Sequence, residues 1–255
     1  MKAVLKLTVF TVLMALSSAV YAQLPDEIQW KHLVQTTKPD SSELVLTLNG
    51  KRLQGKYKIP LDEKSFALYN IKNGMITGDA FWYTNGGHME CKLTYKNGVR
   101  NGLKENYDNN GKVWLRQHYK DGRQDGPSEM YNGDRLVSKA EYKAGKKHGL
   151  SVTYAGENIA TESNYENDLK TGSSKSYGPD GKLVNEVNYK NDRRDGLSIT
   201  YNRGAKTMDA TYVNGERHGV SHMYKPDGTV LFDSYYLLGD KVSKAEFDAY
   251  EQQNK

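Results

Sequence analysis

Short segments in which hydrophobic and polar residues alternate recur along most of the chain. Leu150, Val152 and Tyr154 fall on one side of such a segment, and Ser151 and Thr153 fall on the other. A period of two residues is typical of a half-buried β-strand. Asn-Gly and Asp-Gly pairs separate many of the segments, and these pairs readily adopt the positive φ angles of tight hairpins. The pattern therefore predicts short antiparallel strands joined by hairpin turns.

These segments belong to one internal repeat of 23 or 24 residues. A glycine marks each copy: Gly78, Gly102, Gly126, Gly149, Gly172, Gly196 and Gly219. A tyrosine follows five residues later in every copy: Tyr83, Tyr107, Tyr131, Tyr154, Tyr177, Tyr201 and Tyr224. A second tyrosine comes 11 or 12 residues after the first: Tyr95, Tyr119, Tyr142, Tyr165, Tyr189, Tyr212 and Tyr235. Because no helical segment separates the copies, we expect an all-β fold, an elongated single-layer antiparallel meander of about seven hairpin repeats.

One face of this sheet is expected to carry both tyrosine registers together with Leu, Val and Ile, and the other Ser, Thr, Lys, Asn and Glu. Little in the sequence could cover the first face, and exposed aromatic stripes are typical of partner-binding surfaces. Packing between neighbouring strands also explains the periodicity, so we expect both roles. The candidate partner-binding residues are Tyr83, Tyr95, Tyr107, Tyr119, Tyr131, Tyr142, Tyr154, Tyr165, Tyr177, Tyr189, Tyr201, Tyr212 and Tyr224.

A second candidate surface is a basic edge formed by the turns between copies. Its residues are Arg100, Arg123, Lys147, Lys170, Arg194 and Arg217. Such a row of cations suits an acidic protein surface or anionic phospholipid. The alternative is a solubilising role, since charged turns deter aggregation between sheet edges. We favour the second interpretation, because Asp125, Asp195 and Glu216 are interspersed.

The two ends of the chain depart from the repeat. Lys2 and Lys6, an apolar run over 7–16 and the small residues before position 23 predict a signal peptide over residues 1–22, and hence a periplasmic or extracellular location. Residues 23–77 are interpreted as an N-terminal cap that includes a degenerate repeat, in which Ile71 replaces the tyrosine. Repeats then occupy 78–241. Residues 242–255 are expected to form a C-terminal capping helix that opens with a capping box between Ser243 and Glu246.

The composition and the candidate reactive residues mainly exclude classes of function. The chain has 36 Lys and Arg residues and 31 Asp and Glu residues. Removal of the signal peptide with Lys2 and Lys6 leaves 34 basic and 31 acidic residues, a net charge of +3. Such a small positive charge does not predict a nucleic-acid partner. A single cysteine, Cys91, excludes a disulfide scaffold and is expected to pack in a strand. His218 and His222 are four residues apart, but in a turn and strand rather than a helix. We expect no catalytic, cofactor or metal site, and no enzyme.

The segment from Tyr95 to Gly111 reads Tyr-x-Asn-Gly-x-x-x-Gly-x-x-x-x-Tyr-x-x-x-Gly. It resembles the MORN repeat in its bacterial variant form, a resemblance that extends over about Gly78 to Gly239. It implies short β-hairpins stacked into an elongated sheet. Asn167-Asp168 and Asn191-Asp192 depart from it, since Asp replaces the usual glycine.

The resemblance to bacterial MORN variants also implies a YwqK-like antitoxin. The leading functional hypothesis is an exported, non-enzymatic protein-binding array, in its sharpest form a periplasmic immunity protein that neutralises a secreted toxin. The alternative is a scaffold at the membrane surface or in the envelope that contacts phospholipid.

Overall fold

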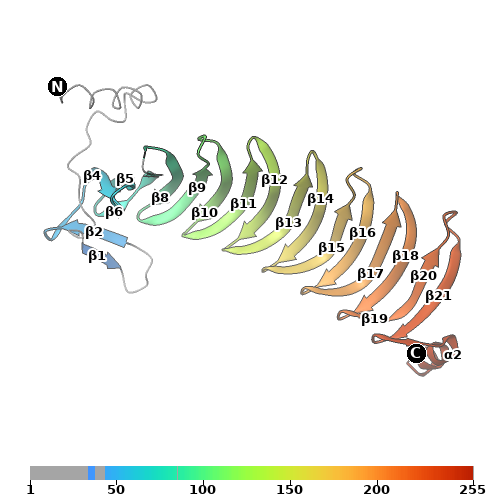
Figure 1. The fold of residues 1–255 in the computed structure, drawn as a ribbon. Coiled ribbons are helices and arrows are strands. Elements are labelled where there is room, and N and C mark those ends of the chain that lie inside the picture. The colour runs from blue at the N-terminus through green and yellow to red at the C-terminus, as the bar shows by residue number, and fades with distance from the viewer. Residues whose placement is uncertain (1–33, 38–43, 85, 255) are drawn as a thin grey trace. The chain divides into compact units, whose positions relative to one another are not determined.

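The computed structural model describes residues 34–37, 44–84 and 86–254, so the predicted signal peptide lies outside the described residues. Contacts divide the chain into two compact units, Met1–Gly111 and Lys112–Lys255, which we describe separately. Every described strand pairs in antiparallel fashion, mostly with its neighbour in the sequence, and a short helix ends the described chain (Figure 1). The predicted all-β single-layer meander of hairpins is therefore confirmed.

The first unit contains two sets of strands. A three-stranded sheet comprises β1 (Val34–Thr37), β2 (Leu44–Leu48) and β3 (Lys51–Arg52). The hairpin strands are β4 (Gly55–Pro60), β5 (Phe66–Lys72), β6 (Met75–Ile76), β7 (Gly78–Tyr83), β8 (Met89–Lys96) and β9 (Val99–Tyr107). Gly55 pairs with Ile71 as Gly78 pairs with Tyr95. Residues 55–76 thus follow the register of the repeat.

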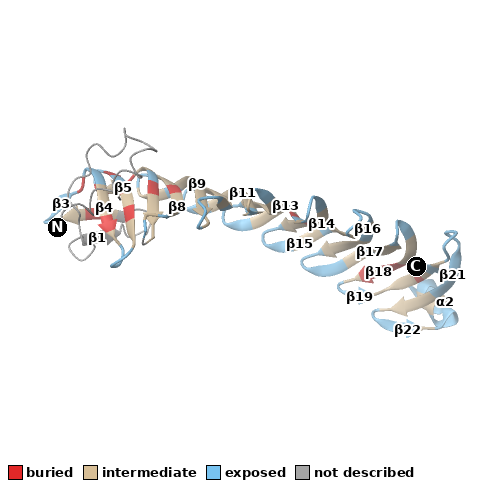
Figure 2. Ribbon diagram, turned by 45° about the horizontal axis from the view of Figure 1, so that its top comes forward, coloured by how far each residue is buried: buried red, intermediate tan, exposed pale blue. Residues whose placement is uncertain are grey.

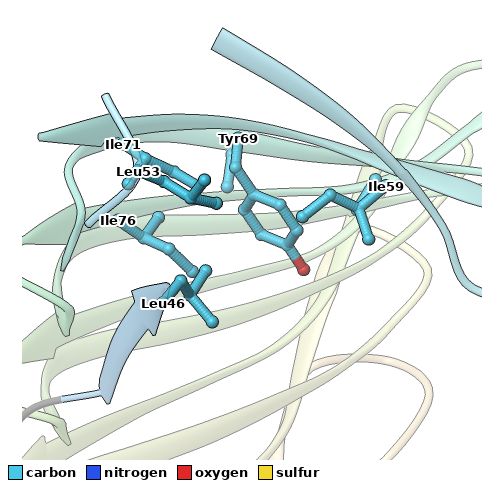
Figure 3. Close-up of a cluster of buried hydrophobic side chains, with 8 residues drawn as sticks. Leu46, Leu53, Ile59, Tyr69, Ile71 and Ile76 are labelled. Atoms are coloured by element: carbon cyan, nitrogen blue, oxygen red, sulfur yellow. The ribbon is translucent and has the colours of Figure 1, made fainter. Parts of the chain in front are cut away.

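A hydrophobic core lies between these two sets of strands. Figure 3 shows Leu46 of β2 and Leu53 facing Ile71 and Ile76 of the first hairpin repeat. The cluster comprises Leu46, Leu53, Ile59, Ala67, Tyr69, Ile71, Ile76 and Ala80. Leu46 and Ile59 are fully inaccessible to solvent. Hydrogen bonds tie the first turn to the covering segment, since Leu46 N donates to the Gly74 carbonyl and Gly74 N to the Leu53 carbonyl.

The second unit is a run of antiparallel strands that ends in a helix. The strands are β10 (Val113–Lys120), β11 (Arg123–Asn132), β12 (Arg135–Lys143), β13 (Lys146–Ala155), β14 (Asn158–Glu166), β15 (Leu169–Tyr177), β16 (Leu183–Lys190), β17 (Arg193–Asn202), β18 (Ala205–Val213), β19 (Glu216–Arg217), β20 (Gly219–Tyr224), β21 (Val230–Leu237) and β22 (Asp240–Val242). The helix is α2 (Lys244–Gln253). No described helix is long and apolar enough to cross a bilayer.

Most strand pairs of this unit contain a register shift, and the repeat glycine lies at such a shift. Between β14 and β15 the register shifts between Ser163 and Tyr165, opposite the stretch that holds Gly172 at φ 65°. Residues with a Cβ rarely adopt such positive φ angles. The conformation at the bulge therefore accounts for the spacing of glycine in the sequence.

Figure 2 shows buried residues gathered in the first unit and few in the second. In the second unit the residues with little exposure include Val152, Ser163, Asp209, Ala210 and Tyr212. They lie on several strands, and three of the five side chains carry a polar group. A sheet with one layer has no opposing surface against which to bury apolar side chains.

Hydrogen bonds between successive turns link the repeats of the second unit. Gly145 N donates to the Gln124 carbonyl at 2.7 Å, and Asp168 N donates to the Lys147 carbonyl at 2.9 Å. Asp168 is one of the residues that replace glycine, and it adopts φ 74°. Its carboxylate accepts a hydrogen bond from Lys147 N at 2.7 Å, and Asp192 accepts one from Lys170 N in the same way. These hydrogen bonds offset the backbone strain of an aspartate at a positive φ angle.

The predicted capping helix is present. Ser243 and Glu246 form the reciprocal capping box that opens α2. Phe247 packs against Tyr235 of β21, with ring centroids 5.4 Å apart. The strand register corrects one assignment made from the sequence. Tyr236, and not Tyr235, pairs with Gly219 and is therefore the second tyrosine of the last repeat.

Candidate binding groove

The two tyrosine registers lie on opposite faces of the sheet. On β14, Tyr165 and Ser163 share one face, and Glu162 points to the other, because side chains alternate along a strand. The Tyr177 hydroxyl donates to Glu162 at 2.6 Å, which places Tyr177 on the face of Glu162. The expectation of a single tyrosine face is therefore wrong. The register pairs Val152 with Glu162 and Ser151 with Ser163, so the face that carries Leu and Val on β13 continues as charged residues on β14.

On one side, which we call the carboxylate face, first-register tyrosines donate to acidic side chains. The pairs in the second unit are Tyr131 with Glu129, Tyr177 with Glu162 and Tyr224 with Asp209, and the first unit contains a pair of the same kind, Tyr107 with Glu105. Several of these acids also face a cation: Arg116 and Lys139 lie 3.9 Å from Glu129, and Lys206 lies 2.5 Å from Asp209. The hydrogen bond to Glu162, with burial, raises the pKa of Tyr177 to about 12. This face is rich in charge, and its charges are largely matched.

The other side, which we call the ladder face, combines second-register tyrosines with the predicted basic edge. Each cation pairs across its hairpin with one tyrosine and lies over the ring of the next. Lys170, for example, is the register partner of Tyr165, and its Nζ lies 4.8 Å from the ring centroid of Tyr189. The series reads Tyr142, Lys147, Tyr165, Lys170, Tyr189, Arg194, Tyr212, Arg217 and Tyr236. We call this series the tyrosine–cation ladder.

Hydrogen bonds order the ladder at its arginine end. Arg194 Nη1 and Arg217 Nε both donate to the Tyr212 hydroxyl, at 3.2 and 3.3 Å, and Arg217 Nη1 donates to the Tyr236 hydroxyl at 3.1 Å. Burial raises the pKa of Tyr212, but the hydrogen bonds from Arg217 and Arg194 outweigh it, so the pKa lies below its usual value. Burial raises the pKa of Tyr165, which faces lysines. The arginines thus reach tyrosine hydroxyls through several N–H groups of one planar guanidinium, a geometry that an ammonium group lacks.

Small polar side chains form a floor beside the ladder. Two columns of cross-strand partners make it up: Ser151, Ser163, Ser174, Val187, Ser198 and Ala210, and next to them Thr153, Thr161, Ser176, Asn185, Thr200 and Met208. Some hydroxyls pair with each other, as Ser163 does with Ser174 at 2.7 Å. Ladder and floor together enclose a groove of about 550 Å³. The Ser and Thr columns were not recognised as site residues in the sequence, although their alternation with Leu and Val was visible.

The groove is positively charged. Its lining includes Lys147, Lys170, Arg194 and Arg217 of the ladder, together with Lys175, and no Asp or Glu. Unlike the cations of the carboxylate face, the four ladder cations form no ion pair with any carboxylate of the described chain. Their partners are tyrosine rings and hydroxyls. Such a groove attracts anionic groups and repels cationic ones.

Two segments match the family model of the MORN repeat variant. They are residues 100–121 and 170–191. The second match contains Lys170, Tyr177 and Tyr189, which represent the ladder and the carboxylate face in one copy. A MORN repeat variant is thus detected at two places, and it indicates a repeat-based binding role. No curated protein matches the chain.

The remaining sequence candidates fall outside the groove. Arg123 of the predicted basic edge is exposed at a turn, and Arg100 pairs with Tyr95 in the first unit. Tyr83 stacks on Phe66, with ring centroids 4.9 Å apart. Tyr95 lies beside Trp82.

The residues considered for chemistry also lie apart. His218 packs on Tyr250, whereas His222 Nδ1 lies 2.7 Å from an Asp233 oxygen, so the two histidines do not converge. Cys91 is half-buried in β8, and burial raises its pKa. Within the described ranges no three His, Cys, Asp or Glu side chains gather so as to hold a metal ion.

Proposed function

We propose that this protein is an exported, non-enzymatic repeat array that binds a protein partner, and that it acts in the periplasm as an immunity protein that neutralises a toxin. The observation that carries the proposal is the groove: four cations without carboxylate partners stand in a row beside tyrosines and an open hydroxyl floor. Tyrosine and arginine are the residues enriched in protein interfaces. The basic start and apolar run of residues 1–22 support export.

In this proposal the array neutralises its partner by covering part of the partner's surface. A rigid sheet that presents the same contact in successive repeats covers an extended surface of its partner without rearranging. If that surface includes an active site, substrate is excluded. The row of cations also accelerates association with an acidic partner, because opposite charges steer the encounter.

The test is capture followed by inhibition. The purified full chain is immobilised and exposed to an envelope extract of its own source, and a protein retained in one-to-one ratio is then assayed with and without the chain. We expect that protein to be a hydrolase such as a lipase, nuclease or peptidoglycan hydrolase, and its activity to fall in proportion to added chain until equivalence. A captured protein whose activity is unchanged contradicts neutralisation.

The same row of cations supports a second candidate, a scaffold that lies on anionic phospholipid. Sedimentation with vesicles separates the two. Binding to vesicles that contain phosphatidylglycerol, lost with neutral vesicles and accompanied by no captured protein, would replace the immunity proposal with the scaffold. We expect no vesicle binding at physiological salt.

A further inference from the structure

The ladder places one cation in each of four successive repeats of the second unit; in the hairpin before them the equivalent partner of Tyr119 is Gln124. A repeat contributes two strands, and strands lie about 4.8 Å apart, so successive ladder cations are spaced roughly 10 Å apart across the sheet. Lys147, Lys170, Arg194 and Arg217 follow this spacing, each on a strand that begins a new hairpin. The turn-to-turn hydrogen bonds hold the backbone of the same four residues, because each carbonyl accepts from the next turn. The spacing is therefore built into the scaffold.

A ligand that uses all four cations must present anionic groups at the same interval and on the same side. In a pleated strand, residues three apart point to opposite faces, so a β-strand does not satisfy this condition. A polyproline II helix has three residues per turn and rises about 3.1 Å per residue, so every third side chain points the same way at intervals of roughly 9 Å. This conformation matches the ladder.

The walls of the groove suit the same conformation. Polyproline II segments bind in shallow grooves lined by aromatic side chains, and their exposed backbone carbonyls accept hydrogen bonds. Here Tyr165, Tyr189 and Tyr212 line one side of the groove, and Ser and Thr hydroxyls lie across its floor. The lining itself contains no Asp or Glu, and the nearby carboxylates of Asp168 and Asp192 accept hydrogen bonds from the backbone N of Lys147 and Lys170.

We propose that the groove binds an acidic polyproline II segment of the protein partner, with a carboxylate at every third residue, and that these carboxylates contact Lys147, Lys170, Arg194 and Arg217. The proposal rests on the proposed function, because it identifies the part of the partner that the array recognises. It assigns the four cations a direct role in place of the solubilising one favoured by the sequence.

Three labelled peptides of twelve residues test the spacing. The first repeats Glu-Pro-Pro four times, the second replaces each Glu by Gln, and the third has four Glu followed by eight Pro. Fluorescence anisotropy with the purified full chain at low salt should give about tenfold tighter binding for the first peptide than for the third, and no measurable binding for the second. Equal affinity for the first and third would show that charge alone is recognised, and would overturn the proposal.

Adjacent cations in the turns provide a matched control for the site. The double variant Lys147→Gln, Arg194→Gln removes two ladder cations, whereas Lys146→Gln, Arg193→Gln removes two exposed neighbours and changes the net charge equally. We expect the first variant to weaken binding of the Glu-Pro-Pro peptide by about tenfold and the second by less than about twofold. Equal losses in the two variants would overturn the assignment to the groove. Circular dichroism spectra of both variants verify that each remains folded.

The captured partner separates failure of this inference from failure of the proposed function. A neutralised partner that binds both double variants as tightly as the unmodified chain refutes the groove and leaves the immunity proposal intact. Absence of any neutralised partner refutes the immunity proposal itself. Anionic vesicles that bind through the same two cations, with no binding of the Glu-Pro-Pro peptide, would identify the groove as a lipid site and overturn the inference.

Discussion

The same two positions of the repeat are apolar and buried in the first hairpin repeat of the first unit but aromatic and cationic in most repeats of the second unit. In that first hairpin repeat they are Ile71 and Ile76, which are 2% and 5% exposed, and in the second unit they are pairs such as Tyr165 and Lys170. The turn backbone is bonded in the same way at both places: Gly74 N donates to the carbonyl of Leu53 in the covering segment, and Asp192 N donates to the carbonyl of Lys170 in the adjoining repeat. The difference is the layer above the sheet, because Leu46 and Leu53 cover the first pair.

The floor of the groove shows the same contrast. Gly78 and Tyr95 are partners, and the next two pairs on the same face are Ala80 with Leu93 and Trp82 with Cys91. The corresponding pairs on β13 and β14 are Ser151 with Ser163 and Thr153 with Thr161. Apolar residues at these positions mark a covered repeat, and hydroxyls mark an open one. The residues that vary between copies therefore indicate where the sheet meets solvent or a partner.

The largest effect expected from this comparison concerns the core of the first unit. Ile59→Ala removes three carbons from a fully inaccessible site and should lower the free energy of unfolding by about 2–5 kcal/mol. The identical change Ile199→Ala, in a half-buried position of the second unit, should cost about 1 kcal/mol. Urea denaturation monitored by fluorescence measures both. Equal losses would show that the second unit has a core of its own.

The second unit should depend instead on hydrogen bonds between its turns. Asp168→Ala retains a Cβ at φ 74° and loses the carboxylate that accepts from Lys147 N, so we expect a loss of about 2 kcal/mol. Asp168→Gly relieves the backbone strain and should recover more than half of that loss. If both variants are as stable as the unmodified chain, the turn hydrogen bonds contribute little.

The helix α2 is a small counterpart of the layer that covers the first unit. Ser243→Ala removes the capping box and should cost about 1 kcal/mol of local stability. Hydrogen exchange should become faster in 244–253 and in the strand of Tyr235, which Phe247 then no longer covers. The exposed substitution Gln252→Ala provides the control and should leave exchange of Tyr235 unchanged.

The smallest expected effect is a difference in how the tyrosines of the two faces of the second unit titrate with pH. The pKa of Tyr177 is raised to about 12, so its protonated form is favoured in the folded state, and that stabilisation is complete below pH 10 and is lost as the pH rises toward 12. The pKa of Tyr212 is lowered, so the folded state gains stability as the pH rises through that pKa toward 10. Absorbance titration of Tyr177→Phe and Tyr212→Phe should remove a late and an early component, respectively. The reverse order would contradict the assignment of the faces.

Much of the fold was predictable from local pattern. The glycine and tyrosine spacings predicted the hairpins, and the positive φ angles at Asn97 and Gly98 agree with the Asn-Gly turns. The capping box at Ser243 was likewise readable, because it involves residues only three apart. The partner-binding role of the tyrosines and of the basic edge remains a prediction.

The sequence by itself determined that this protein is a meander of hairpin repeats, because turns, bulges and alternation are properties of neighbouring residues. It did not determine which residues of adjacent strands lie on the same face of the sheet. A shift of one residue in register exchanges the two faces of a strand, so pairing Val152 with Glu162 was enough to separate the tyrosine registers. Only the tertiary structure placed each cation over the tyrosine of the next repeat, because that contact joins residues about 18 positions apart through the strand register, as between Arg194 and Tyr212.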